Sequence, residues 1–291
     1  MTSGNDTNQV DSSSLDGELL ETLRGSSAAV YGVTALENEL FVARDRSNVI
    51  EVFAVTSALT PSSCQRRLTV TSLGLPQQVR PLDIAACVKT RSLYVNDAGN
   101  ARLHRVDAKS GRVLNTWRVD SRAWGISVTA GGTVLVCCRG AGLLCEYTSS
   151  GQLVRPLRLS DDVAQPVHAV KLRSQYVVSH YDVQSNSAGA CVCVVDDSGG
   201  VRRDYDQLSQ PHHLAIVCDD ARSIVAVADC GNDRVVLLDA GTLNAVAVVG
   251  GSQRPHRLCV QQGRLYVGQW DGRVLVFQLS TGLSSAAAVY E

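Results

Sequence analysis

The sequence predicts an all-β fold, a six-bladed β-propeller of four-stranded antiparallel blades. Two observations lead to this prediction. One short segment recurs six times along the 291 residues at nearly constant spacing. Each recurrence is followed by short apolar runs that Gly, Asp, Asn and Ser separate. No stretch keeps the apolar spacing of an amphipathic helix, so strands joined by hairpins account for the whole repeat.

The recurring segment is the predicted first strand of each blade. It reads AVYGVTAL, RPLDIAAC, RAWGISVT, QPVHAVKL, QPHHLAIV and RPHRLCVQ, beginning at Ala29, Arg80, Arg122, Gln165, Gln210 and Arg254. One aligned column, whose members we call the column residues, holds Gly32, Asp83, Gly125, His168, His213 and Arg257. Successive column residues are 51, 42, 43, 45 and 44 positions apart. This spacing is typical of one four-stranded propeller blade.

The other three strands follow in order within each repeat. A second apolar run, such as SLYVND or RLYVGQ, is joined by a short polar turn to a third, such as RLHRVD or RVLVFQ. A fourth and more polar run, such as VLNTWRV, comes next. The first three runs are apolar on both faces because neighbouring blades would cover both, whereas the fourth would meet water at the rim.

The last repeat supplies only three strands, and the beginning of the chain offers the missing one. The segment DGELLETLRG has a strand pattern, so we expect residues near Leu19 to Leu23 to add as the outer strand of the last blade. The alternative closure uses GLSSAAAVYE at the C-terminus. The predicted organisation is a disordered polar tail over 1–17, a single propeller domain over 18–280 and a C-terminal tail over 281–291.

The composition excludes several classes of protein. With 45% apolar residues the chain is globular, and 27 Lys and Arg against 28 Asp and Glu argue against a general attraction to nucleic acid or anionic membranes. No apolar run has the length of a membrane helix and no leader peptide is visible, so we expect a cytoplasmic protein without a membrane partner. No DNA-reading motif is present. The ten cysteines lack a C-x-x-C pair, which indicates buried, reduced thiols.

Two repeats resemble a known family. The segments LYVNDAGNARLHRVD and VAVADCGNDRVVLLD are similar to the NHL repeat, in which a strand ends in Asp and a Gly-containing turn leads to Asn and then Arg. The resemblance implies an NHL-type propeller like the NHL domains of tripartite-motif proteins, which select protein partners or RNA. Asp and Asn side chains cap turns, so we expect a structural role for these residues. They are Asp97, Asn100, Arg102, Asp229, Asn232 and Arg234.

Strand direction alternates within a blade, which places two sets of connections on one face of the predicted disc. The loops that lead into the first strands and the turns between second and third strands lie there together. Arg, Trp and Tyr are enriched in binding hot spots, so we expect this face to bind a partner. The predicted partner-binding residues are Tyr31, Arg44, Arg46, Asp83, Trp124, Arg139, Tyr181, Arg257, Trp270 and Arg273.

Four of the six histidines, His168, His212, His213 and His256, fall on the same face in three adjacent repeats. Converging imidazoles bind zinc. The dipeptides Pro211-His212 and Pro255-His256 resemble the zinc ligands of the propeller lyase that completes peptide amidation, although a third Pro-His is missing. The alternative to a zinc cofactor is no cofactor, with neutral histidines hydrogen-bonded at the channel mouth or used in partner contacts.

The function that we expect from the sequence is a non-catalytic scaffold that recognises a protein or peptide. Two alternatives remain open. One is binding of single-stranded RNA on the same face, where bases stack on aromatic rings and phosphates pair with Arg. The other is a metal-dependent lyase or hydrolase in the channel.

Overall fold

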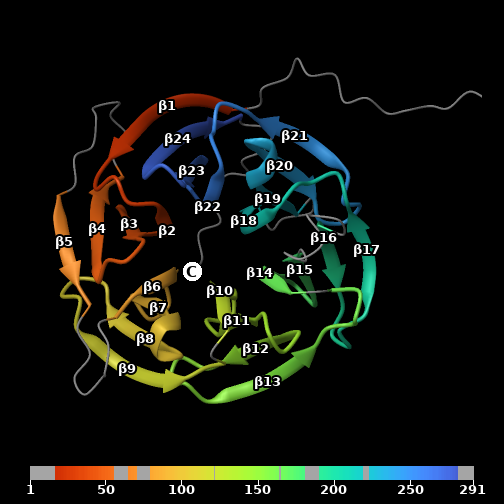
Figure 1. Cartoon of the computed structure of the whole chain (residues 1–291), viewed down its shortest axis with the longest axis horizontal. Coiled ribbons are helices and arrows are strands. Elements are labelled where there is room, and N and C mark those ends of the chain that lie inside the picture. The colour runs from red at the N-terminus through yellow and green to blue at the C-terminus, as the bar shows by residue number, and fades with distance from the viewer. Residues whose placement is uncertain are drawn as a thin grey trace, which may run out of the picture.

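The computed structural model describes residues 17–55, 65–70, 79–120, 122–163, 165–180, 190–218 and 223–280. These residues form six four-stranded antiparallel sheets arranged around a central axis (Figure 1). The predicted six-bladed propeller is confirmed. Among the described residues, no helix has the length and apolar character of a transmembrane span.

The first three blades follow one another along the chain. Blade 1 consists of β2 (Val30–Leu36), β3 (Glu39–Arg44), β4 (Val49–Ala54) and β5 (Arg66–Thr69). Blade 2 consists of β6 (Pro81–Cys87), β7 (Ser92–Asp97), β8 (Arg102–Asp107) and β9 (Val113–Arg118), with the short 3-10 helix η1 (Ala98–Asn100) before β8. Blade 3 consists of β10 (Ala123–Val128), β11 (Val134–Cys138), β12 (Leu143–Tyr147) and β13 (Leu153–Arg158).

The remaining blades complete the ring. Blade 4 consists of β14 (Pro166–Leu172), β15 (Gln175–His180), β16 (Cys191–Val195) and β17 (Val201–Tyr205). Blade 5 consists of β18 (Pro211–Cys218), β19 (Ile224–Asp229), β20 (Arg234–Asp239) and β21 (Ala245–Val249), with η3 (Cys230–Asn232) before β20. Blade 6 consists of β22 (Pro255–Gln261), β23 (Arg264–Gln269), β24 (Arg273–Leu279) and, from the other end of the chain, β1 (Gly17–Arg24).

Burial falls from the inner strands to the outer ones because adjacent blades cover both faces of the inner strands. Strands β7 and β19 are buried at every position, whereas β13 and β17 are mostly exposed or half-buried. The apolar core is accordingly divided into layers between neighbouring blades. One layer joins Leu237 and Val249 of blade 5 to Leu258 and Phe277 of blade 6.

The ring closes through β1, which pairs antiparallel with β24 as the outermost strand of blade 6. Leu23 lies opposite Val274 and is buried in the layer that also contains Val30, Phe53 and Val276. The N-terminal strand therefore occupies the position where the sequence placed it. The competing segment over 282–291 lies outside the described residues, as do the two predicted tails except for Gly17.

Candidate functional site

The first strand of every blade lies nearest the central axis (Figure 1), and we call the region around this axis, which β2, β6, β10, β14, β18 and β22 surround, the channel. The loops leading into these strands and the turns between second and third strands lie on one side of the disc, which we call the top face. Each column residue lies close to the beginning of its first strand. The column side chains are therefore placed in the channel, below its mouth on the top face.

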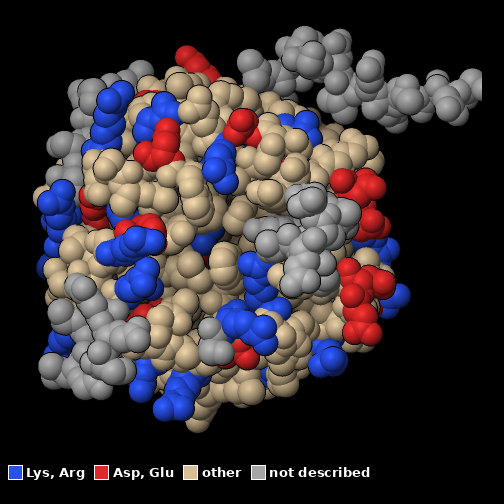
Figure 2. All heavy atoms as spheres, in the orientation of Figure 1, with Lys and Arg blue, Asp and Glu red and all other residues tan. Residues whose placement is uncertain are grey.

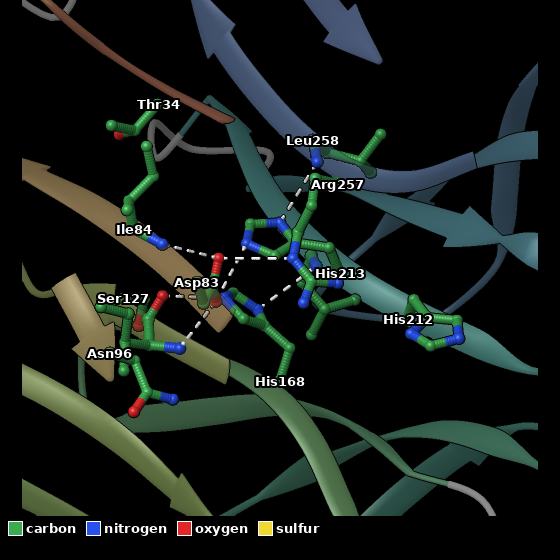
Figure 3. A network of polar contacts seen from close by, with 12 residues as sticks. Thr34, Asp83, Ile84, Asn96, Ser127, His168, His212, His213, Arg257 and Leu258 are labelled. Atoms are coloured by element: carbon green, nitrogen blue, oxygen red, sulfur yellow. Dashed lines mark hydrogen bonds and ion pairs between the residues drawn. The ribbon is translucent and has the colours of Figure 1, made fainter. Parts of the chain in front are cut away.

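Asp83 is fully buried beside His168, His213 and Arg257 (Figure 3). One carboxylate oxygen accepts a hydrogen bond from the backbone N–H of Ile84 at 3.0 Å and the other from Ile126 of the next blade at 2.9 Å. The guanidinium Nε of Arg257 lies 3.4 Å from Oδ1 of Asp83. Burial raises the pKa of Asp83 to about 6, even though Arg257 and the two N–H groups favour its charged form.

His168 and His213 repeat the same blade-to-blade contact. Nδ1 of His168 accepts the N–H of Leu214 at 3.2 Å, and Nδ1 of His213 accepts the N–H of Leu258 at 3.4 Å. Both donors are the residues that directly follow the column residue of the next blade. The two imidazole rings lie against each other with centroids 3.7 Å apart. The side chains of Asp83, His168 and His213 therefore link neighbouring blades by accepting backbone N–H groups.

Arg257 makes the corresponding link across the seam between blades 6 and 1. It donates to the backbone oxygens of Tyr31 at 2.8 Å, Leu82 at 3.0 Å and His256 at 3.0 Å. The column residue of blade 1 is Gly32, where a Cβ atom would lie 2.9 Å from the backbone nitrogen of Ile84. Because Gly32 has no side chain, Arg257 reaches across blade 1 to blade 2.

Asp83, His168 and His213 are the three described residues whose ligand atoms all lie within 4.8 Å of one another, which makes them the best candidate for a metal site. The fit is poor. Nε2–H of His168 donates to the backbone oxygen of Ile126 at 3.0 Å while Nδ1 accepts from a backbone N–H, so neither nitrogen has a lone pair directed at a cation. The positive charge of Arg257 beside Asp83 also opposes a second cation there.

The four histidines that the sequence grouped as zinc ligands are divided between two places. His168 and His213 belong to the channel, whereas His212 and His256 contact each other, with ring centroids 4.4 Å apart, at the mouth. The register of β18 against β19 shifts between Pro211 and Leu214, the span that contains His212 and His213. Burial lowers the pKa of His168 and His212 to about 3 and that of His213 and His256 well below the usual value. The imidazoles are therefore neutral near pH 7.

Four rings at the mouth form what we call the aromatic cluster: Tyr31, His212, His256 and Trp270. The His256 ring lies 4.8 Å from that of Trp270 and 5.3 Å from that of Tyr31, and the Tyr31 and Trp270 rings are 5.7 Å apart. Nδ1–H of His256 donates to the backbone oxygen of Val30 at 3.0 Å, which fixes this ring in place. Trp270 is 39% exposed, so the cluster reaches the surface.

Three exposed arginines lie close to the aromatic cluster. The guanidinium carbon of Arg254 lies 5.3 Å from the ring centroid of Trp270, within cation–π range. Burial and then Asp45 raise the pKa of Tyr31, and the charges of Arg46 and Arg80 lie near enough to oppose this shift. We call Arg46, Arg80, Arg122 and Arg254 the rim arginines. Figure 2 shows a hollow near the centre of the face it presents, with basic and acidic side chains intermixed around it.

The structure places three of the predicted partner-binding residues in the interior. Asp83 and Arg257 lie in the channel, and Arg44 is 1% exposed. Nε and Nη2 of Arg44 donate to Oε2 of the buried Glu51 at 3.0 and 2.8 Å. Arg44 was expected at the surface because it precedes a turn, but as the last residue of β3 it still lies between blades. Tyr181 lies outside the described residues.

The other predicted partner-binding residues lie on the top face with partly or fully exposed side chains. They are Tyr31, Arg46, Trp124, Arg139, Trp270 and Arg273. The guanidinium of Arg139 stacks over Trp124 at 4.8 Å, and Nε of Arg139 donates to Gln165 at 3.1 Å. Arg273 pairs with Asp271 at 2.6 Å, so its charge is neutralised locally.

Hydrogen bonds to Asp229 hold the turn motif of blade 5 together. Asp229 accepts hydrogen bonds from the N–H of Ser209 at 2.7 Å and from the side chains of Asn232 at 2.8 Å and Arg234 at 2.7 Å. The motif thereby joins the loop before β18 to the turn after β19.

The same turn in blade 2 has a different side-chain partner. Asp97 accepts hydrogen bonds from the N–H of Arg80 at 3.2 Å and from Asn100 at 2.7 Å, and it contacts Nε2 of His104 at 3.3 Å. His104, two residues after Arg102, occupies the role expected of Arg102. Burial opposes ionisation of Asp97, but the hydrogen bonds from His104 and Asn100 lower its pKa.

Three of the rim arginines, Arg80, Arg122 and Arg254, were absent from the predicted partner-binding set. The signal was present, since each of them begins one of the aligned segments.

Arg254 has a left-handed backbone with φ of +44°, as do Gln165 and Gln210 with φ of +50°, and each of the three precedes a proline. This conformation, which a repeat pattern does not reveal, turns the chain into the first strand.

Comparisons with known proteins support the fold alone. No family model matches the chain, and no curated protein matches it, so membership of the NHL family stays a prediction. The virginiamycin B lyase of Staphylococcus aureus superposes with a TM-score of 0.62 at 12% identity, covering 91% of this chain and 100% of that one.

Two further solved structures have the same degree of similarity. Hydrazine synthase of Kuenenia stuttgartiensis has a TM-score of 0.60 at 14% identity, over 87% of this chain and 96% of that one. The WD40 β-propeller domain of Doa1 has a TM-score of 0.60 at 14% identity, over 92% and 99%. The chain is therefore a β-propeller, a fold consistent with an interaction scaffold.

Proposed function

We propose that this protein is a non-catalytic propeller scaffold that recognises a protein or peptide segment at the mouth of its channel. The observation that carries the proposal is the aromatic cluster, which ends in a part-exposed Trp270 beneath Arg254. Trp, Tyr and Arg are the residues most enriched among binding hot spots. Rings fixed by neighbouring blades lose little conformational entropy when a partner binds.

The channel below the mouth supports a scaffold rather than an enzyme. Asp83 and His168 use their polar atoms to hold backbone groups of adjacent blades, and His213 accepts such a bond through Nδ1. A general base needs a lone pair directed at the substrate. In this channel the hydrogen bonds serve the contacts between blades.

The charge of the top face favours protein over RNA. Its described connections carry five arginines and seven aspartates. The arginines are Arg46, Arg80, Arg122, Arg139 and Arg254, and the aspartates are Asp45, Asp120, Asp161, Asp162, Asp206, Asp233 and Asp271. Binding to a phosphate backbone requires a positively charged surface, which this balance does not supply.

Site-specific photo-crosslinking tests the proposal. A benzoylphenylalanine at position 270 is compared with one at Val88, an exposed residue on the opposite face of the disc. We expect protein crosslinks from position 270 only. Equal crosslinking from both positions, or labelled RNA binding at low salt with no protein crosslink, would contradict a protein-recognition site at the mouth.

A further inference from the structure

The rim arginines carry positive charge that the chain does not neutralise. In the described part of the chain, no carboxylate forms an ion pair with the side chain of Arg80, Arg122 or Arg254. The Arg46 side chain is 81% exposed and lies 3.6 Å from Asp45, a weak contact in water. The guanidinium groups are therefore available to an anionic partner.

Several top-face aspartates are already engaged by the turns that contain them. Asp120 accepts the backbone N–H of Arg122 at 2.7 Å, and Asp233 accepts that of Arg254 at 2.6 Å. In both cases the aspartate holds the backbone of a rim arginine while the guanidinium lies elsewhere. These aspartates therefore position the rim arginines.

Asp45, Asp120, Asp233 and Asp271 lie close to the rim arginines, but the remaining described top-face aspartates lie on the other side of the mouth. The rim arginines lie at blades 6, 1, 2 and 3, whereas Asp161, Asp162 and Asp206 lie in the loops that lead into β14 and β18. A partner that contacts the whole mouth would meet positive charge on one side and negative charge on the other. A short segment with a few carboxylates suits this arrangement, whereas a continuous polyanion would be repelled by the aspartates.

The floor between the rim arginines is uncharged and aromatic. His212 and His256 are buried and neutral, and they belong to the aromatic cluster, whose outer member is Trp270. Arg254 covers part of the Trp270 ring and leaves 39% of the residue exposed. An apolar side chain that packs on this ring would lie beside a guanidinium group.

We propose that the mouth binds an acidic peptide segment, whose aromatic or large aliphatic side chain packs on Trp270 and whose flanking carboxylates face Arg80 and Arg254. This inference rests on the proposed function and specifies the chemistry of the partner. The aromatic cluster sets the position of the apolar side chain. The rim arginines select carboxylates around it.

Fluorescence anisotropy with labelled peptide libraries of equal length tests the inference. One library has a central Phe or Trp flanked by Asp and Glu, a second has the same centre flanked by Lys and Arg, a third has it flanked by Ser and Gly, and a fourth is acidic with a central Gly. We expect the acidic aromatic library to bind at least about tenfold more tightly than the other three, and its affinity to fall with added NaCl.

Matched variants locate the binding. We expect Trp270→Ala to weaken binding of the acidic aromatic library about tenfold and Arg254→Gln about fivefold, since both residues lie at the mouth. Arg91→Gln is the control, because Arg91 is an exposed arginine on the opposite face that pairs with Glu37 at 2.8 Å. The control should bind like the wild type. Circular dichroism and thermal unfolding show that each variant is folded.

The outcomes distinguish the two proposals. If the neutral or basic aromatic library binds best and Trp270→Ala abolishes its binding, the mouth is a recognition site but the acidic specificity is wrong. If no library binds and position 270 gives no protein crosslink, the proposed function and the acidic specificity both fail. If Arg254→Gln and Arg91→Gln weaken binding equally, the attraction is a general charge effect and the inference is overturned.

Discussion

The buried pair Arg44 and Glu51 at the seam of the ring provides the sharpest stability prediction. Replacing Arg44 by Met removes two hydrogen bonds to Glu51 and the donation from Nη1 to the backbone oxygens of Ala28 and Gly272. Leaving one member of a buried ion pair unpaired costs about 3–5 kcal/mol. Glu51 keeps the N–H of Ser26 at 3.0 Å and lies 3.8 Å from Nη2 of the exposed Arg67, so we expect the lower end of this range, about 3 kcal/mol.

A double-mutant cycle by urea unfolding measures this coupling. Glu51→Gln keeps an acceptor for Ser26 but removes the buried charge, so the double variant Arg44→Met/Glu51→Gln should recover about 2 kcal/mol of the loss. The control is Arg273→Met, because Arg273 pairs with Asp271 at the same seam but both side chains are about 40% exposed. Its cost should stay below about 1 kcal/mol. A cost below about 1 kcal/mol for Arg44→Met, or additive costs in the double variant, would refute the reasoning.

Three further predictions concern pH, ring closure and the channel. The four buried histidines have lowered pKa values, so their stabilisation is present above about pH 6.5 and is lost as the pH falls, by at most about 1.4 kcal/mol per pH unit for each histidine. The raised pKa of Asp83 has the opposite effect on stability, but it is one group against four histidines. Urea unfolding should therefore show lower stability at about pH 5.5 than at about pH 7.5. No change in stability would contradict the burial of neutral imidazole rings. Leu23→Ala should lower the free energy of unfolding by about 2–4 kcal/mol. Leu19→Ala, at a half-exposed position of the same strand, should lower it by less than about 0.5 kcal/mol. Equal losses would mean that β1 does not close the ring. Gly125→Ala should lower the midpoint of thermal unfolding, because its Cβ would lie 2.5 Å from a backbone oxygen of blade 4. Gly131→Ala is the control, because a Cβ has room there and the midpoint should not change. Similar midpoints for the two variants would show that the channel can expand.

The fold could be predicted from the sequence because each repeat contains its own strand-forming runs and turn residues. Short runs of β-branched and apolar residues define strands, and Asp97 and Asp229 accept hydrogen bonds from Asn100 and Asn232 at the same point of two repeats. The missing fourth strand of the last repeat pointed to Leu23 and its neighbours, which form β1 in the structure. These features depend on patterns that one blade contains by itself.

The candidate site could be predicted only in part, because side-chain direction depends on neighbouring blades. The sequence placed Trp270 and Tyr31 on the top face, where they lie. It also grouped His212 with His213, but the register of β18 shifts at these residues, and His212 contacts His256 at the mouth while His213 contacts His168 in the channel. Arg257 was expected to bind a partner, but because Gly32 has no side chain, Arg257 extends into the ring and donates to the backbone oxygen of Leu82.

The pairing of β1 with β24 has a consequence for how the chain folds during synthesis. Gly17 lies opposite Leu279, so β1 emerges from the ribosome before blades 1–5 and β24 emerges after them. Blades 1–5 contain all their strands in sequence and can form as they emerge, whereas β1 must wait with an unpaired edge until β24 appears. A strand waiting in this way can pair with the β24 of another chain, so slow translation or high local concentration would favour swapped dimers.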